Sequence, residues 1–163
     1  MSRARRSTVR TIAVEVWMPC PRKPKALAAR MPLEVFVQGK LDVVDEVLAP
    51  GFTDHAPGLP GQPPGREGVK IFAAAVRQAF PDLEIRIDHA VAEGDLVVLH
   101  ITASGTMQGE FAGMPPSGKH ATWNAVHIDR ISDGKVVEHW IVQDQLGMLQ
   151  QLGFIPAPGA VQG

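Results

Sequence analysis

The period of the hydrophobic pattern changes at Pro81, and this change constrains the fold more than any other feature of the chain. Before Pro81, apolar residues recur at the three- and four-residue spacing of amphipathic helices, most clearly in residues 66–80. From Leu83 to Asp88, apolar and charged residues alternate, which is the period of a half-exposed β-strand. Helices followed by strands with short turns predict an α+β domain. We expect a curved antiparallel sheet with the helices packed on one face.

The other elements follow from the same two periods and from Gly and Pro stops. The expected helices cover residues 25–37, 40–48 and 66–80, with a helical tail at 145–153, and the expected strands cover residues 83–88, 96–106, 120–131 and 136–144. Residues 96–106 begin as a continuous apolar run, so this strand should be covered on both faces. Loops 53–66 and 107–119 are rich in Gly and Pro. A ligand pocket is expected on the concave side of the sheet.

Basic side chains are concentrated in residues 1–30, where Glu15 is the only acidic residue. We expect residues 1–23 to be a basic, solvated extension, residues 24–154 to form one domain and residues 155–163 to be a tail. The alternative is an arm that binds nucleic acid or anionic lipid. The net charge of −1 gives the whole chain no bias toward nucleic acid, so no such partner is expected.

The sequence also bears on location. No apolar segment approaches the length of a membrane span, and the stretch IAVEVWM is too short and too interrupted by Glu15 to be a signal-peptide core. Cys20 is the only cysteine, which excludes an internal disulfide and fits a reducing compartment. We therefore expect a cytoplasmic protein without a membrane partner.

A turn at Asp-Gly 133–134 predicts how the last two strands pair. If the turn has two residues and side chains alternate along both strands, one face gathers several aromatic and ionisable groups. The residues expected on that face include Trp123, His127, Asp129, Glu138, Trp140, Val142 and Asp144. His139 is expected on the other face, with a structural role or at a subunit contact. Asp129 and Glu138 are expected to oppose each other in solvent.

Asp144 stands at the end of an apolar strand, where a charge is costly unless it is paired or at a rim. Partial burial beside Trp123 and Trp140 is expected to raise its pKa, and His127 can hold or share its proton. Such a carboxylate suits proton abstraction next to a carbonyl. The alternative is that Asp144 caps the helical tail that begins at Gln145.

Three stretches of the chain resemble a known family. They are residues 38–83, SGTMQGEFAGMPPSGK and DGKVVEHWIVQDQLGMLQQLG, and they resemble, in order and without large gaps, the SnoaL-like polyketide cyclases, also called ester cyclases. The resemblance implies the nuclear transport factor 2-like cone, a roll whose strongly curved sheet carries helices on its concave face. It also implies a homodimer or higher homo-oligomer, and an enzyme that closes a ring on a polyketide ester by intramolecular aldol condensation, without cofactor or metal.

The resemblance also implies site residues. The family's general acid/base is an Asp in the pattern EHW-x-x-x-D, which Asp144 matches, and His127 is the best match for its assisting His. His55, in the pair Asp-His that opens the first loop, is expected at the mouth of the pocket. The residues expected to bind a small hydrophobic or polyketide-like substrate are Trp123, Trp140, Val142, His55 and His100.

Other functions stay open. Ketosteroid isomerases of this fold pair an Asp base with a Tyr donor, and this chain has no tyrosine. Epoxide hydrolases of this fold place an Arg between two Asp residues, but alternation puts Arg130 on the face opposite to Asp144. A non-catalytic small-molecule binder would use Trp123 and Trp140 as core residues and Asp144 as a helix cap.

Two further expectations concern metals and assembly. The six histidines show no helical ligand spacing and no Cys cluster accompanies them, so no metal site is expected. The outer face of the sheet is expected to carry Val126, Ile128, Val137 and Ile141, which is too apolar to be left in water. A second copy of the chain is expected to cover it.

Overall fold

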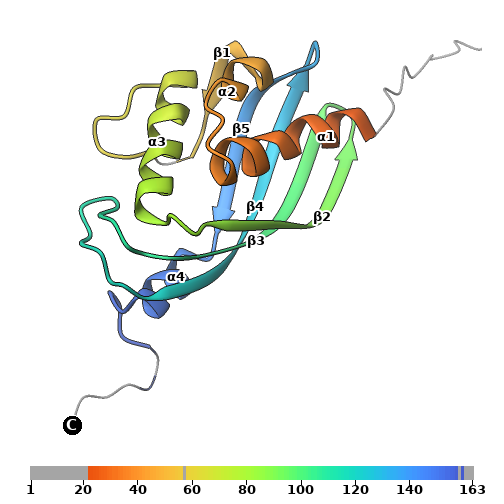
Figure 1. Ribbon diagram of the computed structural model, residues 1–163. Coiled ribbons are helices and arrows are strands. Elements are labelled where there is room, and N and C mark those ends of the chain that lie inside the picture. The colour runs from red at the N-terminus through yellow and green to blue at the C-terminus, as the bar shows by residue number, and fades with distance from the viewer. Residues whose placement is uncertain (1–21, 57, 158, 160–163) are drawn as a thin grey trace, which may run out of the picture.

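Four of the five strands form an antiparallel meander, as the alternating pattern after Pro81 predicts. They are β2 (Glu84–Glu93), β3 (Leu96–Thr106), β4 (His120–Ser132) and β5 (Lys135–Gln143), each paired with the next. The computed structural model describes residues 22–56, 58–157 and 159, so the basic arm expected over residues 1–23 lies almost entirely outside the described residues. Figure 1 shows that the long strands curve and form an open sheet, which confirms the α+β class.

The fifth strand, β1 (Leu48–Asp54), makes the sheet mixed. It lies at the edge and runs parallel to β5, giving the order β1-β5-β4-β3-β2. The expectation of a wholly antiparallel sheet is therefore wrong at this edge, because β1 arrives from the helical half of the chain and not through a hairpin. The pairing places Asp54 directly beside His139.

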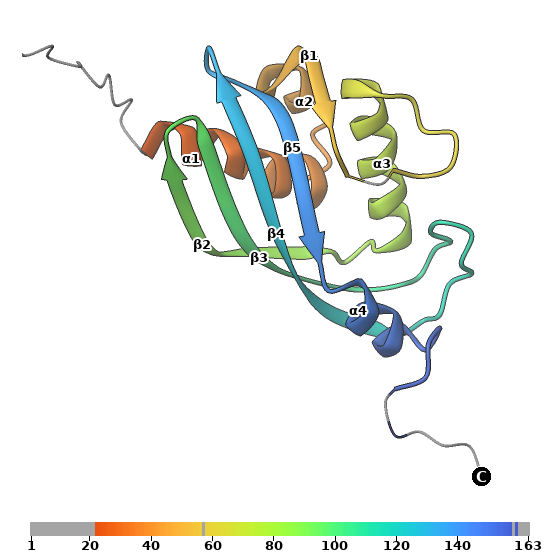
Figure 2. The same cartoon turned by 180° about the vertical axis from the view of Figure 1, so that it is seen from behind.

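The helices precede the meander, except for one at the end of the chain. They are α1 (Arg22–Arg30), the π-helical turn η1 (Met31–Val37), α2 (Val43–Val47), α3 (Gly65–Ala79) and α4 (Gln145–Leu152). Pro32 lies in the first turn of η1, which continues directly from α1. In Figure 1 α1, α2 and α3 lie in front of the sheet, and in Figure 2 they lie behind it. The three helices thus share one face of the sheet.

The core lies between these helices and the facing side of the sheet. β3 alternates strictly between buried and half-buried residues, so it is covered on one face and not on both as expected. Its buried side chains pack with Ala125 of β4, while a second cluster joins η1, α2, α3, β1 and β5 around Val44, Ala73 and Val136. Met148 and Leu152 of α4 close one end against Phe80 and Met107.

The β4–β5 hairpin contains a bulge that changes which residues face the helices. Its turn forms at Asp133 and Gly134, both with positive φ (50° and 72°), as expected for a two-residue turn. Ile131 pairs with Val136, but Arg130 pairs with Glu138, so Val137 is an extra residue. Alternation along β5 therefore restarts out of phase after Val136, and the expected register is wrong beyond that point.

None of the helices in the described part of the chain is long and apolar enough to span a membrane.

Candidate functional site

A cavity of about 370 Å³ lies between the concave face of the sheet and the helices. Most of its lining is apolar. The sheet contributes Leu99, Ile101, Ala125 and Ile141, and the helices contribute Phe36, Phe72 and Val76. Phe111, from the loop between β3 and β4, closes one side through edge-to-face contacts with Phe72 and Phe80. This volume and lining suit a small organic ligand.

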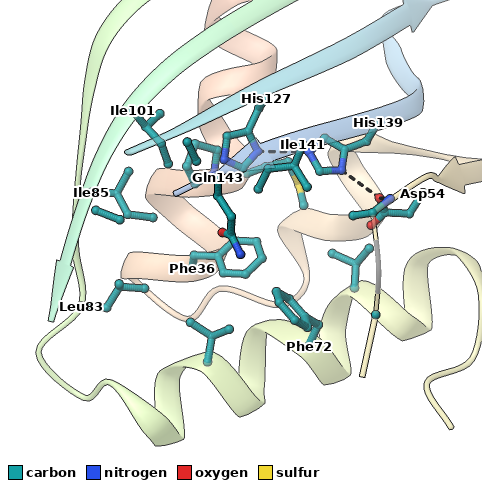
Figure 3. A pocket seen from close by; sticks show the side chains of 18 of the residues that line it. Phe36, Asp54, Phe72, Leu83, Ile85, Ile101, His127, His139, Ile141 and Gln143 are labelled. Carbon is teal, nitrogen blue, oxygen red and sulfur yellow. Dashed lines mark hydrogen bonds and ion pairs between the residues drawn. The ribbon is translucent and has the colours of Figure 1, made fainter. Parts of the chain in front are cut away.

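Ionisable groups are gathered in one part of the wall, where β1, β4 and β5 run side by side. Asp54 Oδ1 lies 2.9 Å from His139 Nδ1, and His139 Nε2 lies 3.1 Å from His127 Nδ1. Figure 3 shows these three side chains in a row above Phe36, with both contacts dashed. Asp129 lines the same cavity from the next inward position on β4. The three strands thus place two carboxylates and two imidazoles around one apolar space.

The hydrogen bonds set the charge of the outer two members of this row. Burial raises the pKa of the Asp54 carboxyl, but the hydrogen bond from His139 and smaller attractions outweigh it, so its pKa lies below the ordinary value. Burial lowers the pKa of His139, but its bond to Asp54 and the charges of Asp129 and Asp54 raise it above the ordinary value. An ionised Asp54 and a protonated His139 therefore support each other.

His127 has the opposite behaviour. Burial, followed by the charge of His139, lowers the pKa of His127 from 6.5 to about 3, against a smaller opposing effect of Asp54. His127 is therefore neutral at physiological pH. Its Nδ1 is engaged by His139, so Nε2 is the ring nitrogen left to contact a ligand in the cavity.

Asp129 is the most buried charged side chain described, with 5% of its surface exposed. No hydrogen bond to its carboxylate forms within the described residues. Burial raises the pKa of Asp129 from 3.8 to about 6; the charge of His139 opposes this rise and that of Asp54 adds to it. Asp129 is thus ionised at neutral pH but far more basic than an exposed Asp, which is the state a general base needs.

Two of the seven residues expected at the site, Trp123 and His127, line the cavity. Asp144 does not. It is exposed and caps α4, where its Oδ1 accepts a hydrogen bond from the Gly147 backbone at 2.8 Å. The expectation that Asp144 shares a face with His127 is wrong, because the bulge at Val137 puts the end of β5 out of phase with β4.

None of the other four expected residues lines the cavity, and they lie on the outer face of the sheet or at the edge of that face. They are Trp140, Val142, His55 and His100. Trp140 stacks on His55, with ring centroids 4.7 Å apart. Val142 is 75% exposed on that face. His100 contacts His89 of β2, with their Nδ1 atoms 3.1 Å apart. A role of these four in binding substrate inside the cavity is therefore not supported by their positions.

Sequence reasoning missed Asp54, Asp129, His139 and Gln143 as cavity residues. Alternation from His127 already placed Asp129 on the same face, but its expected partner Glu138 suggested solvent. His139 and Gln143 reach the cavity only because of the bulge, and Figure 3 shows Gln143 pointing into it beside Phe36. Asp54 needed the parallel pairing of β1 with β5, for which the sequence has no local signal.

In the part of the chain that the structure describes, the side chains of the cavity do not converge as metal ligands would. Within the described residues, no group of three or more His, Cys, Asp or Glu side chains is arranged to hold a metal ion. Three of the four ring nitrogens of His127 and His139 are engaged in the row with Asp54, which leaves only His127 Nε2 directed at the cavity.

Comparisons with known proteins agree with the sequence motifs. The chain matches the family model described as "SnoaL-like polyketide cyclase" over residues 26–152. It is 31% identical over 140 residues to the aklanonic acid methyl ester cyclase DauD of Streptomyces sp. (strain C5). This match covers 80% of this chain and 82% of that relative. It is 31% identical over 123 residues to the nogalonic acid methyl ester cyclase of Streptomyces nogalater, a match that covers 74% of this chain and 91% of that relative. The solved structure of TsrD from Streptomyces laurentii superposes with a TM-score of 0.74 at 28% identity. The superposition covers 82% of this chain and 97% of TsrD.

Proposed function

Since this chain belongs to the SnoaL-like polyketide cyclase family, we propose that it closes a ring in a polyketide ester by intramolecular aldol addition. Asp129 is the general base, and His127 delivers the proton to the new alkoxide. The base expected at Asp144 is thereby reassigned to the carboxylate that lies inside the cavity.

The state of Asp129 carries this proposal. Its carboxylate is buried, lacks a partner among the described residues and has its pKa raised to about 6. A hydrogen on a carbon between two carbonyls is already acidic, so a base of this strength suffices. Positioned proton transfer of this kind typically contributes about a hundred- to ten-thousand-fold in rate.

The steps conserve the atoms of the substrate. Asp129 takes a proton from the carbon between two carbonyls, and the electron pair enters an enolate. The enolate carbon forms a bond to a second carbonyl carbon of the same molecule, whose π electrons move to oxygen. The resulting alkoxide takes a proton from the His127 side of the cavity. Exchange with solvent then returns Asp129 and the imidazole row to their starting states, so the product is an isomer of the substrate.

The lining supports a neutral, largely apolar substrate. Of the described residues that line the cavity, none is Lys or Arg, and Asp54 and Asp129 are both acidic. A free carboxylate there would meet two like charges against the one positive charge of a protonated His139. The relatives DauD and the nogalonic acid enzyme are named as methyl ester cyclases, which fits a substrate whose carboxyl is esterified.

We extend the proposal to assembly and location. A homodimer or larger homo-oligomer would cover the outer face of the sheet, where Val126 pairs with Val142, and Val142 is 75% exposed. Ile141, expected on that face, lines the cavity instead. The cytoplasm stays our predicted location, on the grounds of the single cysteine.

The test compares two Asp→Asn variants with aklanonic acid methyl ester as probe. Ring closure is followed by chromatography as conversion to an isomer of unchanged mass, and proton removal by deuterium uptake at the activated carbon. Asp129→Asn should lower kcat about a hundred- to ten-thousand-fold and slow deuterium uptake in parallel. Asp144→Asn keeps the capping oxygen and should turn over like wild type.

The reverse result, with Asp144→Asn inactive and Asp129→Asn active, would return the base to Asp144. If wild type binds the ester but catalyses neither deuterium uptake nor ring closure, the chain is a non-catalytic binder and the proposal is wrong.

A further inference from the structure

The row formed by Asp54, His139 and His127 ends at the cavity with one uncommitted ring nitrogen, His127 Nε2. From this geometry we infer that Asp54 and His139 form a proton-delivery line whose protonation state sets whether His127 offers the substrate a donor or an acceptor. The inference rests on the proposed function and adds Asp54 and His139 to it as positioning residues. Neither was expected at the site from the sequence.

With Asp54 ionised, the two contacts allow two arrangements of protons. When His139 is an imidazolium, its Nδ1–H donates to Asp54 and its Nε2–H donates to His127 Nδ1, so the neutral His127 must carry its proton on Nε2. When His139 is neutral and still donates to Asp54, its Nε2 accepts from His127 Nδ1–H. His127 Nε2 then carries no proton. One proton on His139 therefore converts His127 Nε2 from an acceptor into a donor.

The donor arrangement fits the last step of ring closure. The alkoxide oxygen takes the proton from His127 Nε2, and His127 Nδ1 takes the proton from His139 Nε2. His139 is left neutral with its remaining proton on Nδ1, still donated to Asp54. His127 stays neutral before and after, which suits a ring whose burial disfavours charge. The positive charge is lost at His139, which lies nearer the rim.

The surroundings of His139 show how its proton is held and replaced. The ionisable side chains that face it are Asp54 from β1 and His127 and Asp129 from β4. The helices that close the cavity present Phe36 and Phe72 and no charge. The side chains of His139 and Asp54 are 18% and 25% exposed and Asp129 is 5% exposed, so the outer end of the line is the part more open to solvent.

The first test needs no variant. ¹⁵N NMR of the imidazole groups in the wild-type protein reports which ring nitrogen of each His carries a proton. At a pH below the pKa of His139, His127 should show a protonated Nε2 and His139 an imidazolium. As rising pH removes the proton from His139, the His127 proton should move from Nε2 to Nδ1 in the same titration. A His127 signal that does not respond while His139 titrates overturns the delivery line.

The second test removes the charge that holds the proton. Asp54→Asn keeps an acceptor for His139 Nδ1 but not the negative charge, so His139 should lose its proton at lower pH than in wild type. The alkaline limb of the kcat/KM profile should move to lower pH, with about a tenfold or larger loss near pH 8 and a smaller loss near pH 6. Asp42→Asn, which removes an equal charge from an exposed residue without a side-chain cap bond, should leave the profile unchanged.

A uniform fall in kcat at every pH, with the His127 tautomer unchanged in Asp54→Asn, would make Asp54 merely structural. Failure of the proposed function looks different. If wild type closes no ring but the His127 tautomer follows His139, the delivery line stands and the assigned reaction is wrong.

Discussion

The two faces of the β4–β5 hairpin carry ionisable side chains at neighbouring positions. On the outer face these side chains are paired and partly exposed, whereas on the cavity face Asp129 is buried and lacks a partner among the described residues. On the outer face, Arg130 Nε lies 2.9 Å from Glu138 and Arg130 Nη1 lies 2.5 Å from Asp95. One residue earlier on β4, Asp129 points into the cavity and has no ion pair within the described part of the chain. Its exposed fraction is 5%, against 35% for the Glu138 side chain.

The comparison distinguishes a carboxylate in a surface ion pair, Glu138, from the carboxylate proposed as the base, Asp129. Glu138 is paired with Arg130 and partly solvated, and such a pair contributes little to stability. Asp129 gives up hydration without gaining a partner, which raises its pKa into the range useful for catalysis. Burial and pairing decide the role of a carboxylate here, because both side chains are carboxylates of the same hairpin.

The largest expected effect comes from placing the same new charge on each face. Ala125 and Val126 are adjacent on β4; Ala125 is 3% exposed on the cavity side, and Val126 lies on the outer side. Ala125→Glu should lower the free energy of unfolding by roughly 2–7 kcal/mol, because it forces a carboxylate into an apolar wall. Val126→Glu should cost far less within the subunit and should dissociate the oligomer proposed through this face.

Urea unfolding followed by circular dichroism measures the first quantity, and light scattering measures the second. Equal destabilisation by both substitutions would show that the two faces do not differ in burial. A Val126→Glu protein with the mass of wild type would count against the outer face as the subunit contact.

The next effect concerns stability as a function of pH. The folded-state pKa of Asp129, about 6, exceeds its unfolded value of 3.8, so the ionised carboxylate destabilises the fold above about pH 6 and this cost disappears below about pH 4. Asp129→Asn should therefore stabilise the protein near pH 8 by on the order of 1–3 kcal/mol and give no gain near pH 4. Thermal unfolding over this pH range measures the difference. Glu138→Gln is the matched control and should show no such gain at high pH.

The smallest effect concerns Asp144, which caps α4 just after the end of β5. Asp144→Ala removes the acceptor for the Gly147 N–H and should cost about 0.5–2 kcal/mol of unfolding free energy. Asp144→Asn should retain most of that stability. Chemical denaturation of both variants measures this, and turnover equal to wild type in both would separate the cap from the base. A large loss of turnover in Asp144→Ala at full stability would contradict the capping role.

The sequence predicted the larger elements because their signals are local. The helical period of residues 66–80, the alternation after Pro81 and the turn at Asp133-Gly134 each depend on residues close together in the chain. Alternation also placed Trp123, His127 and Asp129 on one face of β4 correctly, because β4 has no bulge before its last turn-proximal residues.

The site was only partly predictable because its decisive features are not local. Either Val136 or Val137 can face the core, so the sequence does not show which register follows the turn. The bulge there moved His139 inward and Trp140 outward. Asp54 and His139 are 85 residues apart, and their contact depends on an edge strand that no turn connects to β5.

The parallel attachment of β1 also orders the events of folding. Each of the strands β2 to β5 is joined to the next by a turn or by one loop. Pairing β1 with β5 instead closes a chain segment of more than eighty residues. Closing a long segment costs more chain entropy than closing a hairpin, so such contacts form late. The hairpin therefore brings His127, Asp129 and His139 together in an early, partly folded chain, while Asp54 arrives with the last strand. A partly folded chain can thus hold Asp129 beside the two imidazoles before it has the carboxylate that holds the proton on His139.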